Sequence, residues 1–357
     1  MTSTNSKQVK LACRNVWKVY NGRDPKFYFN AKGDDTSDPA TLAEQMRNEG
    51  AIPAAVDVSF DVHSGEIFVI MGLSGSGKST IVRCLSRLVE PSHGEILLDG
   101  EDLLKKSRKQ LIDIRRHKMG MVFQSFGLLP HLTVAENIAF PLRLQGLSPK
   151  EQHERAARVI ELVGLEGREM SFPRQLSGGQ QQRVGIARSL AVEPELWFLD
   201  EPFSALDPLI RRQMQDEFLR IQSTLKKSIV FITHDFLEAL RIADRMMIMR
   251  DGMVVQVGTP AELIVNPADD YVAEFTRDVP LIRVLLAGDI MQSDLAATDG
   301  MPTVSSTTTV EDILPQLSVN PNGVAVTEGG NVIGVLTSGS VISALARESA
   351  SREELSL

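Results

Sequence analysis

The sequence is poor in cysteine and has no apolar run of the length that crosses a membrane. Its 357 residues include only 2 cysteines, Cys13 and Cys84, which are too few for a disulfide framework and typical of a reducing compartment. No stretch approaches the ~18 consecutive apolar residues of a transmembrane helix. The first residues contain no apolar segment, so we expect no signal peptide. The net charge of −8 lacks the basic excess of a protein whose main partner is nucleic acid.

Charge and aromatic residues are unevenly distributed along an otherwise ordinary globular composition, 43% apolar and 24% charged. Residues 278–357 hold ten Asp or Glu against three Arg, a net charge of −7, and they contain no lysine. The last aromatic residue is Phe275. This shift predicts two domains, residues 1–277 and 278–357. A solvated acidic tail is the alternative, against which stand the apolar segments of the second region.

The first domain shows strand patterns that alternate with helical ones. Residues 56–62 alternate apolar and polar side chains, as in a half-buried strand, and residues 67–71 are continuously apolar, as in a buried parallel strand. Residues 21–50 are polar and break the rhythm, so we interpret them as an insertion. The alternation predicts an α/β domain around a mostly parallel sheet. Further strand patterns cover residues 196–199 and 229–232, with a hairpin at 246–257.

Residues 72–80, GLSGSGKST, carry the strongest chemical signal. They match GxxxxGK[ST] between an apolar strand and a helical pattern, whereas an ordinary glycine-rich turn would need none of this context. Small residues let the backbone wrap a phosphate chain, and successive N–H groups at a helix N-terminus face it. We expect Lys78 to reach the β- and γ-phosphates of ATP and the Ser79 hydroxyl to ligate Mg²⁺. The predicted phosphate-binding residues are Gly72, Ser74, Gly75, Ser76, Gly77, Lys78, Ser79 and Thr80.

Two further segments fit a Mg²⁺–ATP site. The apolar strand at 196–199 ends in Asp200, a candidate Mg²⁺ ligand, and Glu201, a candidate to polarise the attacking water. Taken alone, this could be a strand that runs into an acidic turn. A second segment begins a helical pattern, with a natural N-cap and two glycines that leave the backbone open to phosphate. Its candidate residues are Ser177, Gly178, Gly179 and Gln180.

The order of these segments resembles the ATP-binding cassette (ABC) ATPases over roughly residues 9–275. The resemblance implies an α/β P-loop NTPase domain with a helical subdomain. Gln124 is similar to the family's Q-loop glutamine, a catalytic residue and Mg²⁺ ligand, and His234 to its switch histidine at the γ-phosphate. Tyr20 is the candidate for the aromatic residue that stacks on adenine, and residues 204–207 resemble the D-loop. By themselves, His234 could be a capping or surface residue and Tyr20 a core residue.

The resemblance also implies partners. In this family, Ser177 and Gly179 of one subunit would face the phosphate bound by Lys78 of the other, which gives a head-to-tail dimer with two ATP molecules. The loop after Gln124 resembles importer cassettes, in which it docks an integral membrane permease subunit. Its apolar side chains favour a partner surface, with packing onto its own domain as the alternative. These side chains are Phe126, Leu128, Leu129 and Leu132.

Residues 66–80 and 92–100 resemble the glycine betaine/proline uptake ATPases, which also carry a polar insertion. This implies the ATP-hydrolysing subunit of an importer for glycine betaine, proline or choline-type amines. Such a subunit lies on the cytoplasmic face of the bacterial inner membrane and serves a periplasmic or lipid-anchored substrate-binding protein indirectly. The alternatives are an importer for an amino acid, polyamine or anion, and a soluble ABC ATPase acting on DNA or ribosomes. Against the latter stand the single cassette and the net negative charge.

Residues 289–346 resemble a cystathionine-β-synthase (CBS) unit, which implies a small α+β domain. A helical pattern precedes two apolar strands joined at Gly329-Gly330-Asn331, a strong turn signal. Betaine importers often carry two such units in tandem, whereas this sequence shows one. The resemblance implies that the unit pairs with that of a second subunit. Its role is either regulatory or limited to dimerisation without a ligand.

Overall fold

The computed structural model describes residues 8–29, 38–123, 127–204, 206–277, 279–295 and 300–354, without the side chains of residues 25, 26 and 347–354. The chain divides into two compact units, residues 1–257 and 258–357. Helices α10 (Pro260–Val265) and α11 (Asp270–Thr276) therefore group with the C-terminal unit, upstream of the shift in charge. The assignment of residues 1–277 to the ATPase domain stays a prediction.

The N-terminal unit contains two sheets. The first is antiparallel, with the strand order β2-β1-β4-β5. Strand β2 runs from Ile52 to His63 and includes the strand predicted at 56–62, with the predicted alternation of buried and less buried side chains. The strands of this sheet are β1 (Val9–Tyr20), β2 (Ile52–His63), β4 (His93–Leu98) and β5 (Glu101–Asp102).

The second sheet has the order β10-β9-β3-β8-β7-β6, and the neighbouring strands from β9 to β6 pair in parallel. Every residue of β3, β7 and β8 is buried, so the continuously apolar runs confirm the predicted parallel strands. Strands β9 and β10 are joined through Asp251 and Gly252, at the predicted hairpin. The strands are β3 (Ile67–Met71), β6 (Met119–Val122), β7 (Leu196–Asp200), β8 (Ser228–Ile232), β9 (Arg245–Arg250) and β10 (Met253–Gly258).

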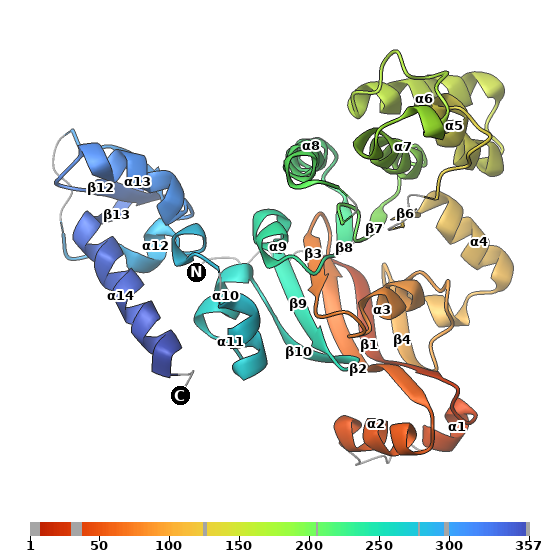
Figure 1. Cartoon of the computed structure of the whole chain (residues 1–357), viewed down its shortest axis with the longest axis horizontal. Coiled ribbons are helices and arrows are strands. Elements are labelled where there is room, and N and C mark those ends of the chain that lie inside the picture. Colours follow the sequence, from red (N-terminus) through yellow and green to blue (C-terminus); the bar gives the residue numbers. More distant parts are fainter. Residues whose placement is uncertain are drawn as a thin grey trace. The chain divides into compact units, whose positions relative to one another are not determined.

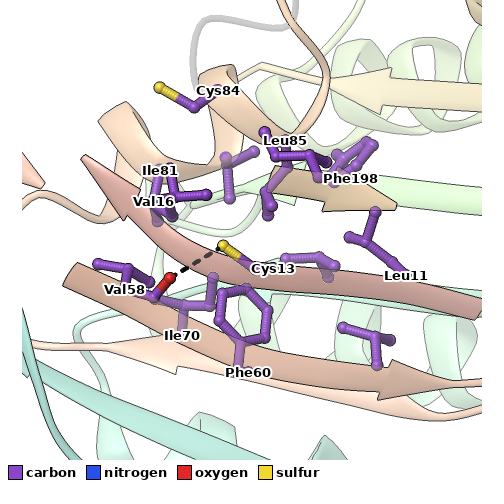
Figure 2. Packing of buried hydrophobic residues seen from close by; sticks show 14 of the residues in the cluster. Leu11, Cys13, Val16, Val58, Phe60, Ile70, Ile81, Cys84, Leu85 and Phe198 are labelled. Carbon is purple, nitrogen blue, oxygen red and sulfur yellow. Dashed lines mark hydrogen bonds between the residues drawn. The ribbon is translucent and has the colours of Figure 1, made fainter. Parts of the chain in front are cut away.

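The main core lies between these sheets and includes helix α3 (Lys78–Leu85). Figure 2 shows part of it, with the Cys13 thiol directed at the carbonyl of Val58, 3.3 Å away. Both cysteines are buried and unpaired, and burial raises the pKa of the Cys84 thiol to about 12. On strands β7 and β8, Trp197 and Phe231 contact Phe218 of α8 (Pro208–Leu225) through their rings. Because successive side chains of a strand point to opposite faces of the sheet, neighbouring residues of these strands pack in different layers.

A group of helices stands apart from the two sheets, next to β6 (Figure 1). It consists of α5, α6 and α7, which pack against one another, and α4 precedes β6 and contacts it. Helices α5, α6 and α7 each begin with a capping box, at Thr133, Ser148 and Ser177, which satisfies amides that a helix N-terminus leaves free. The bounds are α4 (Arg108–His117), α5 (Val134–Gln145), α6 (Pro149–Leu162) and α7 (Gly178–Leu190). This group of helices corresponds to the predicted helical subdomain.

The predicted insertion forms a small core of its own. It contains α1 (Pro25–Tyr28) and α2 (Pro39–Asn48). Tyr28, Ala43 and Met46 are buried with Trp17 of β1 and Val56 of β2. The polar composition of the insertion conceals these few apolar residues, which attach it to the edge of the antiparallel sheet.

The C-terminal unit holds a three-stranded sheet of order β11-β12-β13. The predicted helix is α13 and the predicted hairpin is β12–β13, whose turn residues Gly329 and Gly330 both have a positive φ. Strand β11 pairs in parallel with β12 and was too short to be recognised from sequence. None of the helices that the structure describes is long and apolar enough to span a membrane. The elements are α12 (Ala287–Ile290), β11 (Thr303–Ser305), α13 (Val310–Val319), β12 (Val324–Glu328), β13 (Asn331–Leu336) and α14 (Ser338–Glu354).

Candidate functional site

The loop of residues 72–77 connects β3 to α3 and passes close to two other strands. Gly72 has a φ of +147°, and a Cβ there would lie 2.3 Å from the carbonyl oxygen of Met249. Gly77 has a φ of +97°, and its Cβ would lie 2.2 Å from the carbonyl oxygen of Ala54. Only glycine fits both positions, because any side chain would collide with backbone. The glycines of the motif therefore let the loop settle between β2 and β9.

The polar groups of this loop are arranged for an anion. The Lys78 ammonium donates to the carbonyls of Gly72 and Leu73, both at 2.9 Å, and the residue is only 6% exposed. Burial lowers the pKa of Lys78, although the nearby charges of Glu201 and Asp200 raise it. The Ser76 hydroxyl is buried without a hydrogen-bond partner. An orphaned hydroxyl beside a lysine at a helix N-terminus fits a phosphate chain.

Asp200 lies at the end of β7, within hydrogen-bond reach of α3. The Ser79 hydroxyl donates to Asp200 Oδ1 at 3.0 Å. Burial raises the pKa of Asp200, and the bond from Ser79 partly opposes this shift. Over the residues that the structure describes, no group of three or more His, Cys, Asp and Glu forms a metal site. A hydroxyl and a carboxylate oxygen are the hard ligands that Mg²⁺ prefers, and its remaining ligands would come from phosphate and water.

Glu201 and His234 follow neighbouring parallel strands and meet at one edge of the sheet. Glu201 has a positive φ of 46°, and its amide donates to the carbonyl of Ile232 at 3.1 Å. His234 Nδ1 lies 3.5 Å from Glu201 Oε2, and its side chain is 58% exposed. The structure thus brings the predicted acid and the predicted histidine together, with the histidine open to solvent.

Residues 177–180 begin helix α7 and face outward. The Ser177 hydroxyl accepts from the Gln180 amide at 3.3 Å, and the Gln180 side chain accepts from the Ser177 amide at 3.0 Å. Ser177 and Gly178 are exposed, whereas a Cβ on Gly179 would lie 2.9 Å from Ile210 Cγ2. No hydrogen bond joins this segment to the phosphate loop within the part of the chain that the structure describes. The exposed helix N-terminus can therefore bind a ligand that is held by another chain.

Tyr20 ends β1, opposite Ile52 of β2, and is 37% exposed. The Lys18 ammonium lies 4.8 Å from the centre of its ring. Strand β2, which pairs with the Tyr20 end of β1, also brings the Ala54 carbonyl against Gly77 of the phosphate loop. The role of Tyr20 in stacking on adenine stays a prediction. Gln124 and Phe126, which the sequence analysis also selected, lie outside the described residues.

A groove of about 470 Å³ opens where β6 meets helices α4, α5 and α7. The sequence predicted a partner surface at residues 126–132, and of these Gly127 and Leu129 line the groove. Leu128 and Leu132 are half-buried. Sequence reasoning missed the groove's other apolar residues, because they come from separate elements and no local pattern joins them. They include Ile112, Phe123, Phe140 and Leu144.

Two family patterns match the chain: the ABC transporter pattern over residues 55–204 and the CBS domain over residues 287–347. The trimethylamine N-oxide transport system ATP-binding protein of Ruegeria pomeroyi is 55% identical over 328 residues, which cover 91% of this chain and 94% of that protein. Its counterpart in Pelagibacter ubique is 51% identical over 323 residues, 90% of this chain and 93% of that one.

The glycine betaine/proline betaine transport system ATP-binding protein of Escherichia coli is 48% identical over 283 residues, 79% of this chain and 69% of that protein. Among solved structures, a dimer of the ATP-binding cassette MJ0796 in a post-hydrolysis state with ADP and Pi is 32% identical and has a TM-score of 0.57. That match covers 70% of this chain and 98% of the solved one.

Proposed function

Because the chain belongs to the ABC transporter family of ATP-binding proteins, we propose that it hydrolyses ATP to drive uptake of small methylated amines such as trimethylamine N-oxide or glycine betaine. The family makes it an ATPase coupled to transport, which assembles as a dimer with a membrane permease. The proposal rests on one observation: the phosphate loop, Asp200 and Glu201 lie close together at the same end of the parallel strands.

The roles of the site residues follow from their chemistry. Lys78 would leave the loop carbonyls to neutralise the β- and γ-phosphates. Ser79 and Asp200 would hold Mg²⁺, which stabilises charge on the phosphates when bound. Glu201 would orient and polarise the attacking water, and His234, whose Nδ1 lies 3.5 Å from that carboxylate, would contact the γ-phosphate.

The open N-terminus of α7 supports the second half of the site. Ser177 and Gly178 are exposed there, and the helix dipole at this N-terminus favours an anion. A second copy, arranged head to tail, would bring this segment to the γ-phosphate held by Lys78. Hydrolysis would then need two chains, and opening of the dimer would pass the motion to the permease.

Sequence identity favours the trimethylamine N-oxide class among the possible substrates. This chain is 55% identical to the Ruegeria relative and 48% identical to the E. coli betaine relative. Each substrate is small and carries three methyl groups on nitrogen. An importer for another solute, such as an amino acid, polyamine or anion, is the second candidate, since the transported substrate does not touch this subunit.

The substrate proposal is tested with the chain reconstituted in vesicles with its permease and binding protein. We expect trimethylamine N-oxide to stimulate ATP hydrolysis, and glycine betaine to do so more weakly. Cation–π contacts in an aromatic cage of the binding protein would favour such methylated groups. Stimulation by an amino acid or anion alone would contradict the substrate class and leave the ATPase assignment intact.

The groove beside β6 is our proposed docking site for a cytoplasmic segment of the permease. It is mostly apolar, and Leu144 is 49% exposed at its edge. Leu144→Asp should reduce co-purification with the permease and leave ATP binding unchanged. Met170→Asp is the control, because Met170 is 78% exposed but does not line the groove. Equal recovery of both variants would refute this site.

Two further proposals concern the location of the assembly and the role of the C-terminal unit. We propose that the assembly sits on the cytoplasmic face of the bacterial inner membrane and receives substrate indirectly through a periplasmic or lipid-anchored binding protein. The acidic C-terminal unit would regulate transport, because exposed charges are screened by salt over about 8 Å at physiological ionic strength. A chain cut after Phe275 should retain ATPase activity but lose part of its response to a salt series.

A further inference from the structure

Helices α8 and α9 (Phe236–Ile242) begin beside the Glu201–His234 pair and are joined by one arginine. Arg211 Nη2 donates to the carbonyl oxygen of Leu206 at 3.2 Å, and Nη1 donates to Asp235 Oδ2 at 3.5 Å. Asp235 directly follows His234 and caps α9, since its Oδ1 accepts from the Glu238 amide at 3.2 Å. One guanidinium therefore ties the segment before α8 to the residue after His234.

These contacts form a closed ring that includes Glu201 and His234. The amide and the hydroxyl of Ser204 both donate to the carbonyl of Glu201, at 3.3 and 3.0 Å. On the opposite side, His234 Nδ1 lies 3.5 Å from Glu201 Oε2. The ring consists of Glu201, Ser204, Leu206, Arg211, Asp235 and His234, and the Leu206 amide is tied back to the carbonyl of Phe203 at 3.2 Å. Its longest links are Arg211–Asp235 and His234–Glu201, both at 3.5 Å, the limit of hydrogen-bond distance.

A second contact, one helical turn along, fixes the two helices to each other. Gln215 Nε2 donates to Glu238 Oε1 at 2.9 Å, and these two residues are 7% and 6% exposed. Arg241 Nη1 donates to Gln215 Oε1 at 3.3 Å. Arg211 and Gln215 share a face of α8 by their spacing of four residues. The helices are thus held along their length, and Arg211 sets the register at the end nearest the site.

We propose that Arg211 is a positioning residue for ATP hydrolysis, which holds Asp235 against the segment before α8 and so fixes His234 relative to Glu201. Arg211 Nε is buried without a hydrogen-bond partner, so the two Nη contacts orient the guanidinium. A planar fork can serve two acceptors in fixed directions, which an ammonium cannot. The inference rests on the role proposed above for His234.

The test compares full-length Arg211→Gln and Asp235→Asn in the assembled transporter. Asparagine keeps an oxygen for the α9 cap but turns an amide towards the guanidinium, so it breaks only the link. We expect kcat to fall about tenfold, because small displacements of a reacting group are costly, with the Kd for ATP and the Tm unchanged. Arg211→Lys should recover part of kcat. Arg212→Gln, the exposed neighbour on α8, is the matched control and should hydrolyse at the wild-type rate.

The double variant shows whether the two residues act through one another. If they do, Arg211→Gln with Asp235→Asn is no slower than either alone. Wild-type kcat in both single variants, multiplied losses, or a loss confined to Kd or Tm would overturn the inference. Should Arg211→Gln fail to fold, Asp235→Asn decides by the same criteria. His234→Ala separates the two proposals: if it remains active, the role of His234 fails, whereas an inactive His234→Ala beside active Arg211 variants refutes this inference alone.

Discussion

The phosphate loop and the N-terminus of α7 are both glycine-containing helix starts, yet the fold treats them differently. The loop is enclosed, with Gly72 and Gly77 against backbone and Lys78 buried among its carbonyls. The start of α7 is exposed and satisfied only by its own capping box. One half of the site is complete within the chain, and the other half is presented outward. The contrast supports the proposal that a second chain completes the site.

Removal of the Lys78 ammonium should have the largest effect. Lys78→Ala takes the positive charge from the transferring phosphoryl group, and we expect ATP hydrolysis to fall by at least about 100-fold. The measurement is steady-state phosphate release by the purified chain. A wild-type rate would mean that the enclosed loop is not the phosphate site.

Glu201→Gln should separate binding from hydrolysis. The amide cannot polarise water as the carboxylate does, so we expect a rate loss of about 100-fold with ATP still bound. The protein should then accumulate as a dimer in Mg²⁺–ATP, which size-exclusion chromatography detects. A species that stays monomeric under these conditions would count against a site shared between chains.

A mixing experiment addresses the comparison most directly. Lys78→Ala damages the enclosed half, and Ser177→Arg should block the outward half by placing a bulky side chain at the open helix start. Each variant alone should be inactive. In a head-to-tail dimer the mixed pair has one site with both lesions and one intact site, so an equal mixture should recover about a quarter of the wild-type rate. No recovery on mixing would place both halves in the same chain.

The smallest expected effect is a gain in stability from Asp200→Asn. Burial raises the pKa of Asp200, so its charge disfavours the folded chain wherever the carboxylate is ionised. The variant should raise Tm by about 2–4 °C near neutral pH, if the buried charge costs about 1 kcal/mol, while it abolishes Mg²⁺-dependent hydrolysis. The gain should shrink as the pH falls and the wild-type carboxylate is protonated. Scanning calorimetry over a pH series checks this, and a gain that grows in acid would contradict it.

The elements that carry the chemistry were predictable because each is a local pattern. The runs at residues 67–71 and 196–199 are continuously apolar, and a glycine-rich turn ends the first and two acidic residues end the second. The glycine spacing of the phosphate loop and the N-cap at Ser177 are likewise fixed within a few residues of chain. The insertion was harder, since Tyr28, Ala43 and Met46 gain meaning only by packing on Trp17.

The sequence by itself determined the chemical groups, their order and the helix or strand that bears each one, because local sterics and hydrophobic periodicity act over a few residues. Only the tertiary structure decided which groups meet. Asp200 reaches Ser79 because parallel pairing places β7 near the strand before α3, and His234 reaches Glu201 because β8 lies beside β7. The buried state of Lys78, the apolar groove and the ring through Arg211 arise in the same way, since each needs segments far apart in the chain that no local pattern connects.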